Sequence, residues 1–284
     1  MTYSELKLHW RNKLGNIYNQ DECDHLFYHT CYYIKQWGKA RVLFEKDTTL
    51  TPEDLNTFAQ VLKDLQVHKP IQYIFEETEF YKLRFKVDED VLIPRPETEE
   101  LVDWVVKDYL GKRKIKLLDI GTGSGCIAVA LAKNLISPLV YALDVSPKSL
   151  IVADINAKEN NVEINLLNVD ILELTDAVMD EQFDIIISNP PYILPLEADK
   201  MEKNVLAYEP HLALFVSNND PLQFYKAISN FALLNLIKGG SLYFETHENY
   251  HKEVVELLKD KGFINIQSKK DLQNKPRFVK AQVA

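Results

Sequence analysis

The segment Asn189-Pro190-Pro191-Tyr192 follows an apolar run at residues 183–188 and carries side chains suited to chemistry on a nitrogen atom. Two successive prolines fix the backbone and donate no hydrogen bonds. The carbonyl of Pro190 and the side-chain oxygen of Asn189 can then both accept hydrogen bonds from one substrate NH2 group. This grip orients the nitrogen lone pair and favours pyramidalisation, which an amide nitrogen resists. Because the ring of Tyr192 also offers a face to a planar group, the motif predicts catalysis by positioning, without a strong base.

A second segment, Asp119-Ile120-Gly121-Thr122-Gly123-Ser124-Gly125, has the form of a strand that enters a glycine-rich turn, and we expect Asp119 and residues 121–125 to contact a bound cofactor. Glycines permit a tight turn and let a ligand approach the backbone. The spacing G-x-G-x-G, followed by Cys126, departs from the dinucleotide pattern G-x-G-x-x-G. Asp144 stands roughly twenty residues farther on, where an acid can hydrogen-bond both hydroxyls of an adenosine ribose. Asp170 ends the third strand, next to Ile171 and close to where an adenine ring would lie.

Each feature alone also suits a structural role. Glycines shape turns, Asp144 can cap the helix that starts at Pro147, and Asn-Pro is a common turn dipeptide. Their order along successive strands instead favours a nucleoside cofactor that faces an acceptor site. We therefore predict an S-adenosyl-L-methionine-dependent methyltransferase that modifies a planar amide or amino nitrogen by in-line displacement and releases S-adenosyl-L-homocysteine.

The elements that position these motifs alternate from residue 116 onward. The expected strands are 116–120, 139–144, 164–169, 183–188 and 241–245, with two short strands at the end; the expected helices are 124–134, 147–160, 221–237 and 249–261. Such alternation predicts an α/β fold with a doubly wound, mostly parallel sheet. Sheets of this kind bind ligands at the carboxyl ends of their strands, where both motifs lie.

The preceding residues have a different character. Residues 1–68 read as a helical domain, which we expect to recognise the substrate, with Gly38 as a helix stop and Thr51-Pro52 as a helix start. Residues 69–93 are rich in β-prone aromatic side chains and predict a β-hairpin linker. The methyltransferase domain is then expected over residues 94–284.

The bulk properties limit the class of protein. The chain has 284 residues, a formal net charge of -9 and three cysteines whose spacing matches neither a disulfide framework nor a metal motif. An acidic chain does not suit a phosphate-binding face, so no direct nucleic-acid contact is expected. Residues 1–13 do not resemble a signal peptide, and no stretch is apolar enough to span a bilayer. We expect a cytoplasmic monomer without a metal or membrane contact.

At this point the sequence resembles a known family. Residues 119–125, Asp144 and residues 189–192 look like class I methyltransferases of amino nitrogens. Three further segments look like one branch, the protein-(glutamine-N5) methyltransferases that act on peptide-chain release factors: Lys69-Pro70-Ile71-Gln72-Tyr73-Ile74, Leu92-Ile93-Pro94-Arg95-Pro96-Glu97-Thr98-Glu99 and Tyr208-Glu209-Pro210-His211-Leu212-Ala213-Leu214. The resemblance runs from about Lys69 to Lys280.

The resemblance implies methylation of the glutamine in the Gly-Gly-Gln motif of release factors. It also implies that residues 121–125, Asp144, Ile171 and Asn189 meet the cofactor, and that residues 189–192 hold the glutamine. Glu209 is either a substrate-binding residue or a solvated loop acid. Two departures from the family pattern are Thr246-His247, where a glycine is usual and where we expect a surface histidine, and Asn274, which replaces a glycine but tolerates positive φ.

Three alternatives stay open on the sequence. An N-methyltransferase of an exocyclic amine in RNA or DNA would use the same acceptor motif, because adenine and guanine present a similar planar NH2 group. A related enzyme could modify a glutamine of a ribosomal protein. A binding protein that keeps the fold without catalysis is the third, and detection of methylated product would exclude it.

Overall fold

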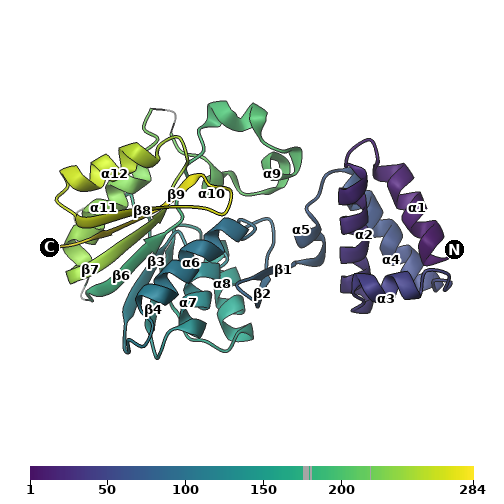
Figure 1. The fold of residues 1–284 in the computed structure, drawn as a ribbon, viewed down its shortest axis with the longest axis horizontal. Coiled ribbons are helices and arrows are strands. Elements are labelled where there is room, and N and C mark those ends of the chain that lie inside the picture. The colour runs from purple at the N-terminus through teal and green to yellow at the C-terminus, as the bar shows by residue number, and fades with distance from the viewer. Residues whose placement is uncertain (175–178, 180, 218) are drawn as a thin grey trace. The chain divides into compact units, whose positions relative to one another are not determined.

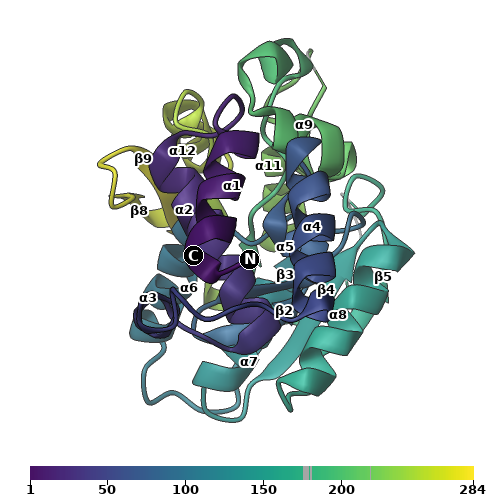
Figure 2. The same cartoon turned by 90° about the vertical axis from the view of Figure 1, so that its right-hand side faces the viewer.

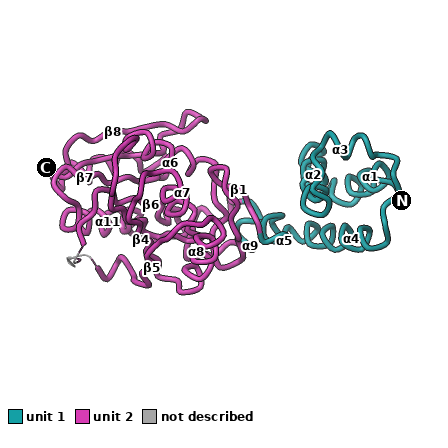
Figure 3. The backbone as a smooth tube through the Cα atoms, turned by 90° about the horizontal axis from the view of Figure 1, so that it is seen from below, with its two compact units in different colours: residues 1–76, 202–208 teal, residues 77–201, 209–284 magenta. Residues whose placement is uncertain are grey.

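The computed structural model describes residues 1–174, 179, 181–217 and 219–284. This described part of the chain divides into two compact units, which Figure 3 colours separately. Unit 1 comprises residues 1–76 and 202–208, and unit 2 comprises residues 77–201 and 209–284. Within the described ranges, no helix is both long enough and apolar enough to cross a membrane.

Unit 1 is a helical bundle (Figure 2). Its core is rich in aromatic side chains. Its helices are α1 (Tyr3–Leu14), α2 (Gln20–Lys35), α3 (Lys39–Phe44), α4 (Pro52–Gln66), α5 (Ile71–Phe75) and α9 (Lys203–Tyr208). The buried rings of Trp10, Phe27 and Phe58 come from α1, α2 and α4 and meet with centroids 5.6, 5.9 and 5.8 Å apart. Burial of these rings holds the apolar faces of the three helices together.

One of the two predicted helix ends in unit 1 is confirmed. Thr51 caps α4 by accepting a backbone N–H of the first turn, and Pro52 is the first helical residue. The predicted stop at Gly38 is wrong, because α2 already ends at Lys35. There Gln36 adopts φ of 57°, a left-handed conformation that closes the helix, whereas Gly38 precedes α3 as its N-cap.

The region expected to be a hairpin linker is only partly a hairpin. It begins with α5, which belongs to unit 1, and the paired strands are limited to β1 (Glu77–Phe80) and β2 (Leu83–Lys86). The hairpin belongs to unit 2 because Phe80 and Phe85 are buried in the core of that unit. The Asn156 side chain also bonds both the N–H and the carbonyl of Lys86, at 2.6 and 2.9 Å.

Unit 2 has the expected α/β architecture. Its described residues form a seven-stranded sheet in the order β5-β4-β3-β6-β7-β9-β8. The strands are β3 (Lys116–Ile120), β4 (Leu139–Asp144), β5 (Asn165–Asn168), β6 (Phe183–Ser188), β7 (Leu236–Glu245), β8 (Ile264–Lys270) and β9 (Pro276–Gln282). The helices are α6 (Pro96–Asp108), α7 (Cys126–Asn134), α8 (Pro147–Glu159), α10 (His211–Leu214), α11 (Gln223–Asn235) and α12 (His251–Asp260), with a 3-10 helix, η1 (Pro195–Lys200). Pairing is parallel from β5 to β7 and antiparallel between β7, β9 and β8, which confirms the predicted mostly parallel sheet.

Helices cover both faces of this sheet (Figure 1). Successive strand residues point to opposite faces. Ile185 and Ile187 of β6 therefore pack with α6 and α7, whereas Ile186 packs with α11 and α12. Because both faces are buried, β6 reads in the sequence as a continuous apolar run rather than an alternating one.

The strand order creates a ligand position between β3 and β6. The chain proceeds from β3 through β4 to β5 at one edge and then returns to β6 on the other side of β3. Such a switch in direction leaves a crevice beyond the carboxyl ends of the two central strands. The glycine turn leaves β3 at this point, and Asn189 directly follows β6.

Candidate functional site

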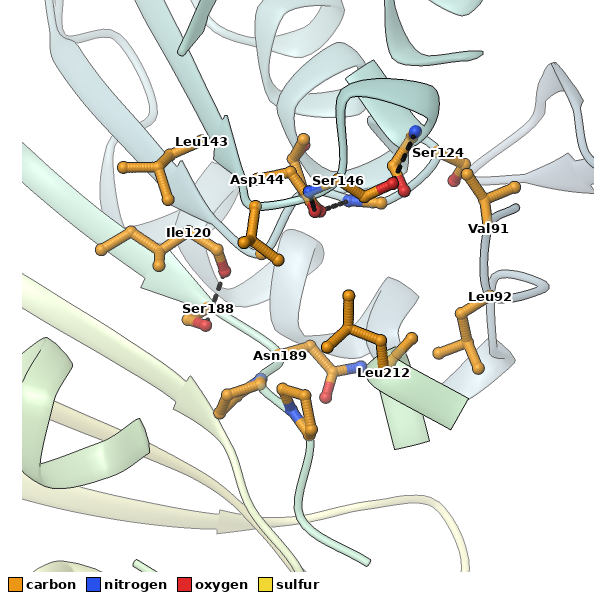
Figure 4. Close-up of a pocket in the computed structure, with 18 of the residues that line it drawn as sticks. Val91, Leu92, Ile120, Ser124, Leu143, Asp144, Ser146, Ser188, Asn189 and Leu212 are labelled. Carbon is orange, nitrogen blue, oxygen red and sulfur yellow. Dashed lines mark hydrogen bonds between the residues drawn. The ribbon is translucent and has the colours of Figure 1, made fainter. Parts of the chain in front are cut away.

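A pocket lies at the carboxyl ends of the central strands, and all of its lining residues belong to unit 2 (Figure 4). Figure 4 shows Asp144 and Ser146 on the opposite side of the pocket from Asn189. We call one side the glycine-turn wall, formed by Gly121, Thr122, Gly123, Ser124, Asp144, Asp170 and Ile171. The other is the asparagine wall, formed by Thr98, Asn189, Pro190, Pro191 and Leu212. The structure thus brings together ten residues predicted from the sequence, namely the seven of the glycine-turn wall with Asn189, Pro190 and Pro191.

The glycine-turn wall presents bare backbone to the pocket. Gly121 and Gly123 have φ of +73° and +54°, and within the described chain nothing lies within 4 Å of where a Cβ would stand on either. The turn is held to β4, since the N–H groups of Gly121 and Thr122 both donate to the Leu143 carbonyl, at 2.8 and 3.0 Å. The space beside these glycines is therefore available to a ligand.

Gly125 serves the scaffold rather than the pocket wall. It has φ of +77° and is the N-cap of α7. A Cβ at this position would lie 3.0 Å from the Cβ of Ala153 in α8. Glycine is thus required by both the backbone conformation and the close approach of two helices.

Asp144 ends β4 and lines the pocket. Its carboxylate accepts hydrogen bonds from the N–H groups of Gly123 and Ser146, both at 2.9 Å (Figure 4). These bonds fix the carboxylate at the pocket wall, and a carboxylate has further lone pairs for ligand hydroxyls. Burial raises the pKa of Asp144, opposed by the N–H of Ser146 and then that of Gly123.

Asp119 lies outside the pocket wall, although we predicted that it contacts the cofactor. It is fully buried and accepts a hydrogen bond from the Thr122 hydroxyl at 2.6 Å. Burial raises the pKa of Asp119 to about 7, against the stabilising effect of that bond. Its direct structural role is to hold Thr122, which does line the pocket.

The next part of the glycine-turn wall is apolar. Ile171 is buried and packs in the same core cluster as Ile228 of α11, and both line the pocket together with Phe224. Beside them, Asp170 accepts the N–H of Leu172 at 2.9 Å and so closes the turn after β5. A flat aromatic ring with polar edges fits such surroundings better than a charged group does.

Asn189 is held by a partner that the sequence did not reveal. Its side-chain Nδ2 donates to the Thr98 hydroxyl at 3.1 Å, and that hydroxyl donates to the Glu245 carboxylate at 2.7 Å. The strand beneath is also tied in place, because the Ser188 hydroxyl donates to the Ile120 carbonyl at 2.7 Å. Thr98 belongs to a segment that carried the family resemblance, but nothing in that segment indicates its contact with Glu245.

Tyr192 is turned away from the main pocket. Its hydroxyl donates to Glu245 at 3.3 Å, and its ring lies 5.6 Å from that of His247. Both rings line a second, polar pocket, together with Glu197 and Arg277. The expectation of a surface histidine is wrong, because the His247 side chain is only 13% exposed.

Glu209 does not lie in the pocket wall and is not a solvated loop acid. Its side chain is 1% exposed; it accepts the Arg95 guanidinium at 2.6 Å and the N–H of Ile93 at 3.4 Å. Burial raises the pKa of Glu209, opposed by the charge of Arg95. The pair joins two loops that do reach the pocket, through Pro94 and Arg95 on one side and Pro210 on the other. Glu209 therefore holds two pocket-lining loops together without lining the pocket itself.

The pocket suits S-adenosyl-L-methionine by the chemistry of its lining. Open backbone at Gly121 and Gly123 allows close approach of the amino-acid part, and the Asp144 carboxylate suits a pair of ribose hydroxyls. The apolar surface around Ile171 suits an adenine ring. Asn189 stands across from these groups, where an acceptor for a substrate NH2 is required.

Comparison with known proteins agrees with this fold. Residues 98–209 match the model of the methyltransferase small domain. A release factor glutamine methyltransferase from Flavobacterium psychrophilum is 46% identical over 270 residues, which cover 94% of each chain. One from Bacteroides thetaiotaomicron is 38% identical over 271 residues, covering 95% of this chain and 96% of the relative. A methyltransferase structure from Pyrococcus furiosus has a TM-score of 0.51 at 17% identity, covering 80% of this chain and 98% of that one, and shares the fold.

Proposed function

The chain belongs to the release factor glutamine methyltransferase family, and on that premise we propose that it methylates the side-chain N5 of the glutamine in the Gly-Gly-Gln motif of peptide-chain release factors. The methyl donor is S-adenosyl-L-methionine. The observation that carries the proposal is the position of Asn189, which lines the same pocket as the glycine turn and Asp144 while its NH2 group is already bonded to Thr98. Its Oδ1 is thereby available to a substrate.

The residues of the asparagine wall act by orientation. Bound S-adenosyl-L-methionine supplies an electrophilic methyl group and departs as S-adenosyl-L-homocysteine. Asn189 Oδ1 and the Pro190 carbonyl accept hydrogen bonds from the two N–H groups of the glutamine amide. These bonds direct the nitrogen lone pair toward the methyl group in the pocket. After transfer, the nitrogen loses one proton, for which no strong base is needed. The contribution of the protein is preorganised acceptors, which cost no rearrangement during the reaction.

Mass spectrometry of release factors tests this proposal. The purified protein is incubated with S-adenosyl-L-methionine and with a release factor, or with a variant in which the Gly-Gly-Gln glutamine is replaced. We expect one added methyl group on the wild-type factor and none on the variant. Ribosomal proteins, RNA and DNA are assayed in parallel. Methyl groups found there, with none on the release factor, would reject the release factor as substrate.

We propose that unit 1 recognises the release factor. The residues that line the pocket all belong to unit 2, so the described part of unit 1 contributes none of them. Unit 1 also exposes apolar side chains on α3, where Leu43 is 51% and Phe44 80% exposed. Exposed neighbouring apolar residues of this kind suit contact with a folded protein. One chain supplies both walls of the pocket, which supports our proposal that the working unit is a monomer and that it meets its substrate in the cytoplasm.

Substitution of Phe44 tests this role of unit 1. We expect Phe44→Ser to raise KM for the release factor about fivefold, the scale of one interface side chain, with kcat and cofactor affinity unchanged. Leu110→Ser is the matched control, because Leu110 is 81% exposed but belongs to unit 2. Equal KM values for Phe44→Ser and the wild type would remove α3 from the recognition surface.

A further inference from the structure

A chain of three polar side chains supports the reacting end of the pocket. Asn189 follows β6, Thr98 lies in the first turn of α6, and Glu245 is the last residue of β7. The Asn189 amide donates to Thr98 at 3.1 Å, and the Thr98 hydroxyl donates to Glu245 Oε2 at 2.7 Å. Thr98 is 2% and Glu245 1% exposed, so bulk water does not compete for these bonds.

The direction of these hydrogen bonds determines which atom Asn189 offers to a substrate. A threonine hydroxyl has one proton and two lone pairs. Because Thr98 gives its proton to the Glu245 carboxylate, only a lone pair of Thr98 can face Asn189. The asparagine must then present its NH2 group to Thr98, which leaves Oδ1 for the pocket. With the opposite orientation, Asn189 would present a donor and could not accept an N–H from a substrate.

We propose that Thr98 and Glu245 are positioning residues for methyl transfer, which hold the Asn189 amide in the one orientation that offers an acceptor oxygen to the substrate nitrogen. This inference rests on the proposed function, since it takes Asn189 Oδ1 as the contact to the substrate amide. The hydrogen bond to an ionised carboxylate is stronger than one between neutral groups. A buried glutamate is therefore well suited to fix the direction of the whole chain of bonds.

The same carboxylate also reaches the other end of the motif. Its second oxygen, Oε1, accepts the Tyr192 hydroxyl at 3.3 Å. Glu245 thus holds Asn189 through Thr98 and holds Tyr192 directly. One side chain at the end of β7 therefore sets both ends of the Asn-Pro-Pro-Tyr turn.

The charge state of Glu245 determines the donor-to-acceptor direction of the hydrogen bonds from Asn189 through Thr98 to Glu245. Burial raises the pKa of Glu245 to about 7, opposed by the Thr98 hydrogen bond, the charge of Arg277 and the Tyr192 hydroxyl. A protonated Glu245 can donate to Thr98, whose own proton is then free to point at Asn189 and draw the amide oxygen toward it. The described polar and titratable groups that face Glu245 from the surrounding elements include Glu97 and Thr98 on α6, Cys126 on α7, Tyr192 after β6, Arg277 on β9 and Tyr225 on α11, whose hydroxyl donates to the Glu245 backbone carbonyl.

Variants of Thr98 test this series of hydrogen bonds from Asn189 through Thr98 to Glu245, which we call the relay. The transfer rate is measured at saturating cofactor. We expect Thr98→Val, which keeps the shape but lacks the hydroxyl, to lower the single-turnover rate about a hundredfold, the scale of a misplaced catalytic group. Thr98→Ser keeps the hydroxyl and should restore most of the rate. Ser229→Ala controls for loss of a buried hydroxyl, because Ser229 donates to the backbone carbonyls of Tyr225 and Lys226 within α11. A full rate in Thr98→Val, or equal losses in the valine and serine variants, would overturn the proposal.

A double-variant cycle shows whether Thr98 acts through Asn189. If it does, adding Thr98→Val to Asn189→Ala should lower the rate little further. Losses that multiply independently would mean that Thr98 acts elsewhere and would overturn the relay. Cofactor affinity and thermal unfolding are measured for each variant, so that a folding defect is recognised from those readings.

The pH profile supplies a readout that a purely structural role would not change. The wild-type rate should fall as pH falls through about 7, because protonation of Glu245 reverses the relay. Glu245→Gln should be slower and should lose this acidic limb, whereas Thr98→Ser should keep it. An unchanged rate and profile in Glu245→Gln would contradict the inference. Absence of methyl transfer to release factors by the wild type would instead reject the proposed function, and the variants would then be compared on the amine that is methylated.

Discussion

The glycine-turn wall and the asparagine wall face the same pocket but differ in how far apart in the sequence their contacting residues lie. In the glycine-turn wall, the contact between Gly123 and Asp144 joins residues 21 positions apart. In the asparagine wall, Asn189 and Thr98 are 91 positions apart, and Thr98 and Glu245 are 147 apart. The first wall is built mainly from backbone groups of neighbouring strands. The second depends on side chains that only the complete sheet brings together.

This difference corresponds to two tasks, namely binding the cofactor and orienting the acceptor amide. Backbone N–H groups and glycine conformations suit a cofactor that is the same in every reaction cycle, because they are fixed once the strand and turn have formed. The orientation of an acceptor amide is a finer requirement, since an amide turned by half a rotation has nearly the same shape but the opposite polarity. We therefore expect changes in the glycine-turn wall to alter affinity, and changes in the asparagine wall to alter rate.

The largest effect is expected for Asn189→Ala. Loss of a preorganised acceptor should lower the single-turnover rate by about a hundredfold or more. Calorimetry should show that S-adenosyl-L-methionine still binds with largely unchanged affinity. Full activity in this variant would mean that the asparagine wall does not orient the substrate, and the contrast between the two walls would fail.

The opposite pattern is expected for Asp144→Ala. Removal of the carboxylate should weaken cofactor binding by roughly 1–3 kcal/mol, the value of a lost charge-assisted hydrogen bond. At saturating cofactor, the transfer rate should stay close to that of the wild type. Titration calorimetry that gives an unchanged dissociation constant would exclude Asp144 from the cofactor site.

Gly125→Ala examines how far the turn that supports the glycine-turn wall depends on backbone conformation at its last residue. An alanine at φ of +77°, with its Cβ 3.0 Å from that of Ala153, should cost about 1–3 kcal/mol in the free energy of unfolding. Gly123→Ala should cost less, because it has positive φ without a close neighbour in the described chain. Chemical denaturation measures both, and equal costs would show that the helix contact is not limiting.

The smallest effect is expected from Asp119→Asn and depends on pH. The pKa of Asp119 is about 7 in the folded protein and about 3.9 in an unfolded chain, so folding takes up a proton between these values. Its contribution to stability is complete below pH about 4 and is lost as pH rises through about 7. Asparagine does not titrate. The Tm of Asp119→Asn minus that of the wild type should therefore rise by a few degrees between pH 5 and pH 8. Each kcal/mol of stability that the wild type loses corresponds to about 2–4 °C in Tm. A constant difference would show that Asp119 does not titrate in this range.

Much of the sheet could be predicted from sequence because its central strands are buried on both faces. Strands β3, β4 and β6 have the predicted bounds, since each is a short apolar run that ends at a motif. Strand β7 instead begins at Leu236, earlier than expected. The expected helix 221–237 and strand 241–245 left Gly239 and Gly240 between them, but both glycines lie within β7. There Gly239 adopts φ of +75° and the pairing with β6 shifts register.

The sequence predicted the site residues that stand at the end of their own strand. It did not predict the contacts between residues that are far apart in the sequence. Asp144 ends β4 and Asn189 directly follows β6, so strand order alone brought them to one pocket. Glu209 gave no local sign of its burial, because its partner Arg95 is 114 positions away. Glu245 is an acid at the end of an apolar strand, and only the packing of α6 against β7 shows that Thr98 meets it.

The composition of unit 1 has a consequence for the order in which the protein is made. This unit includes residues 202–208, although its other helices all lie before residue 77. A ribosome therefore synthesises most of the sheet of unit 2 before α9 emerges, and the Tyr208 hydroxyl can reach the Val67 carbonyl only after that. An N-terminal fragment cut at residue 76 lacks this last helix. Independent expression of unit 1 accordingly calls for a circularly permuted or linked chain that restores α9.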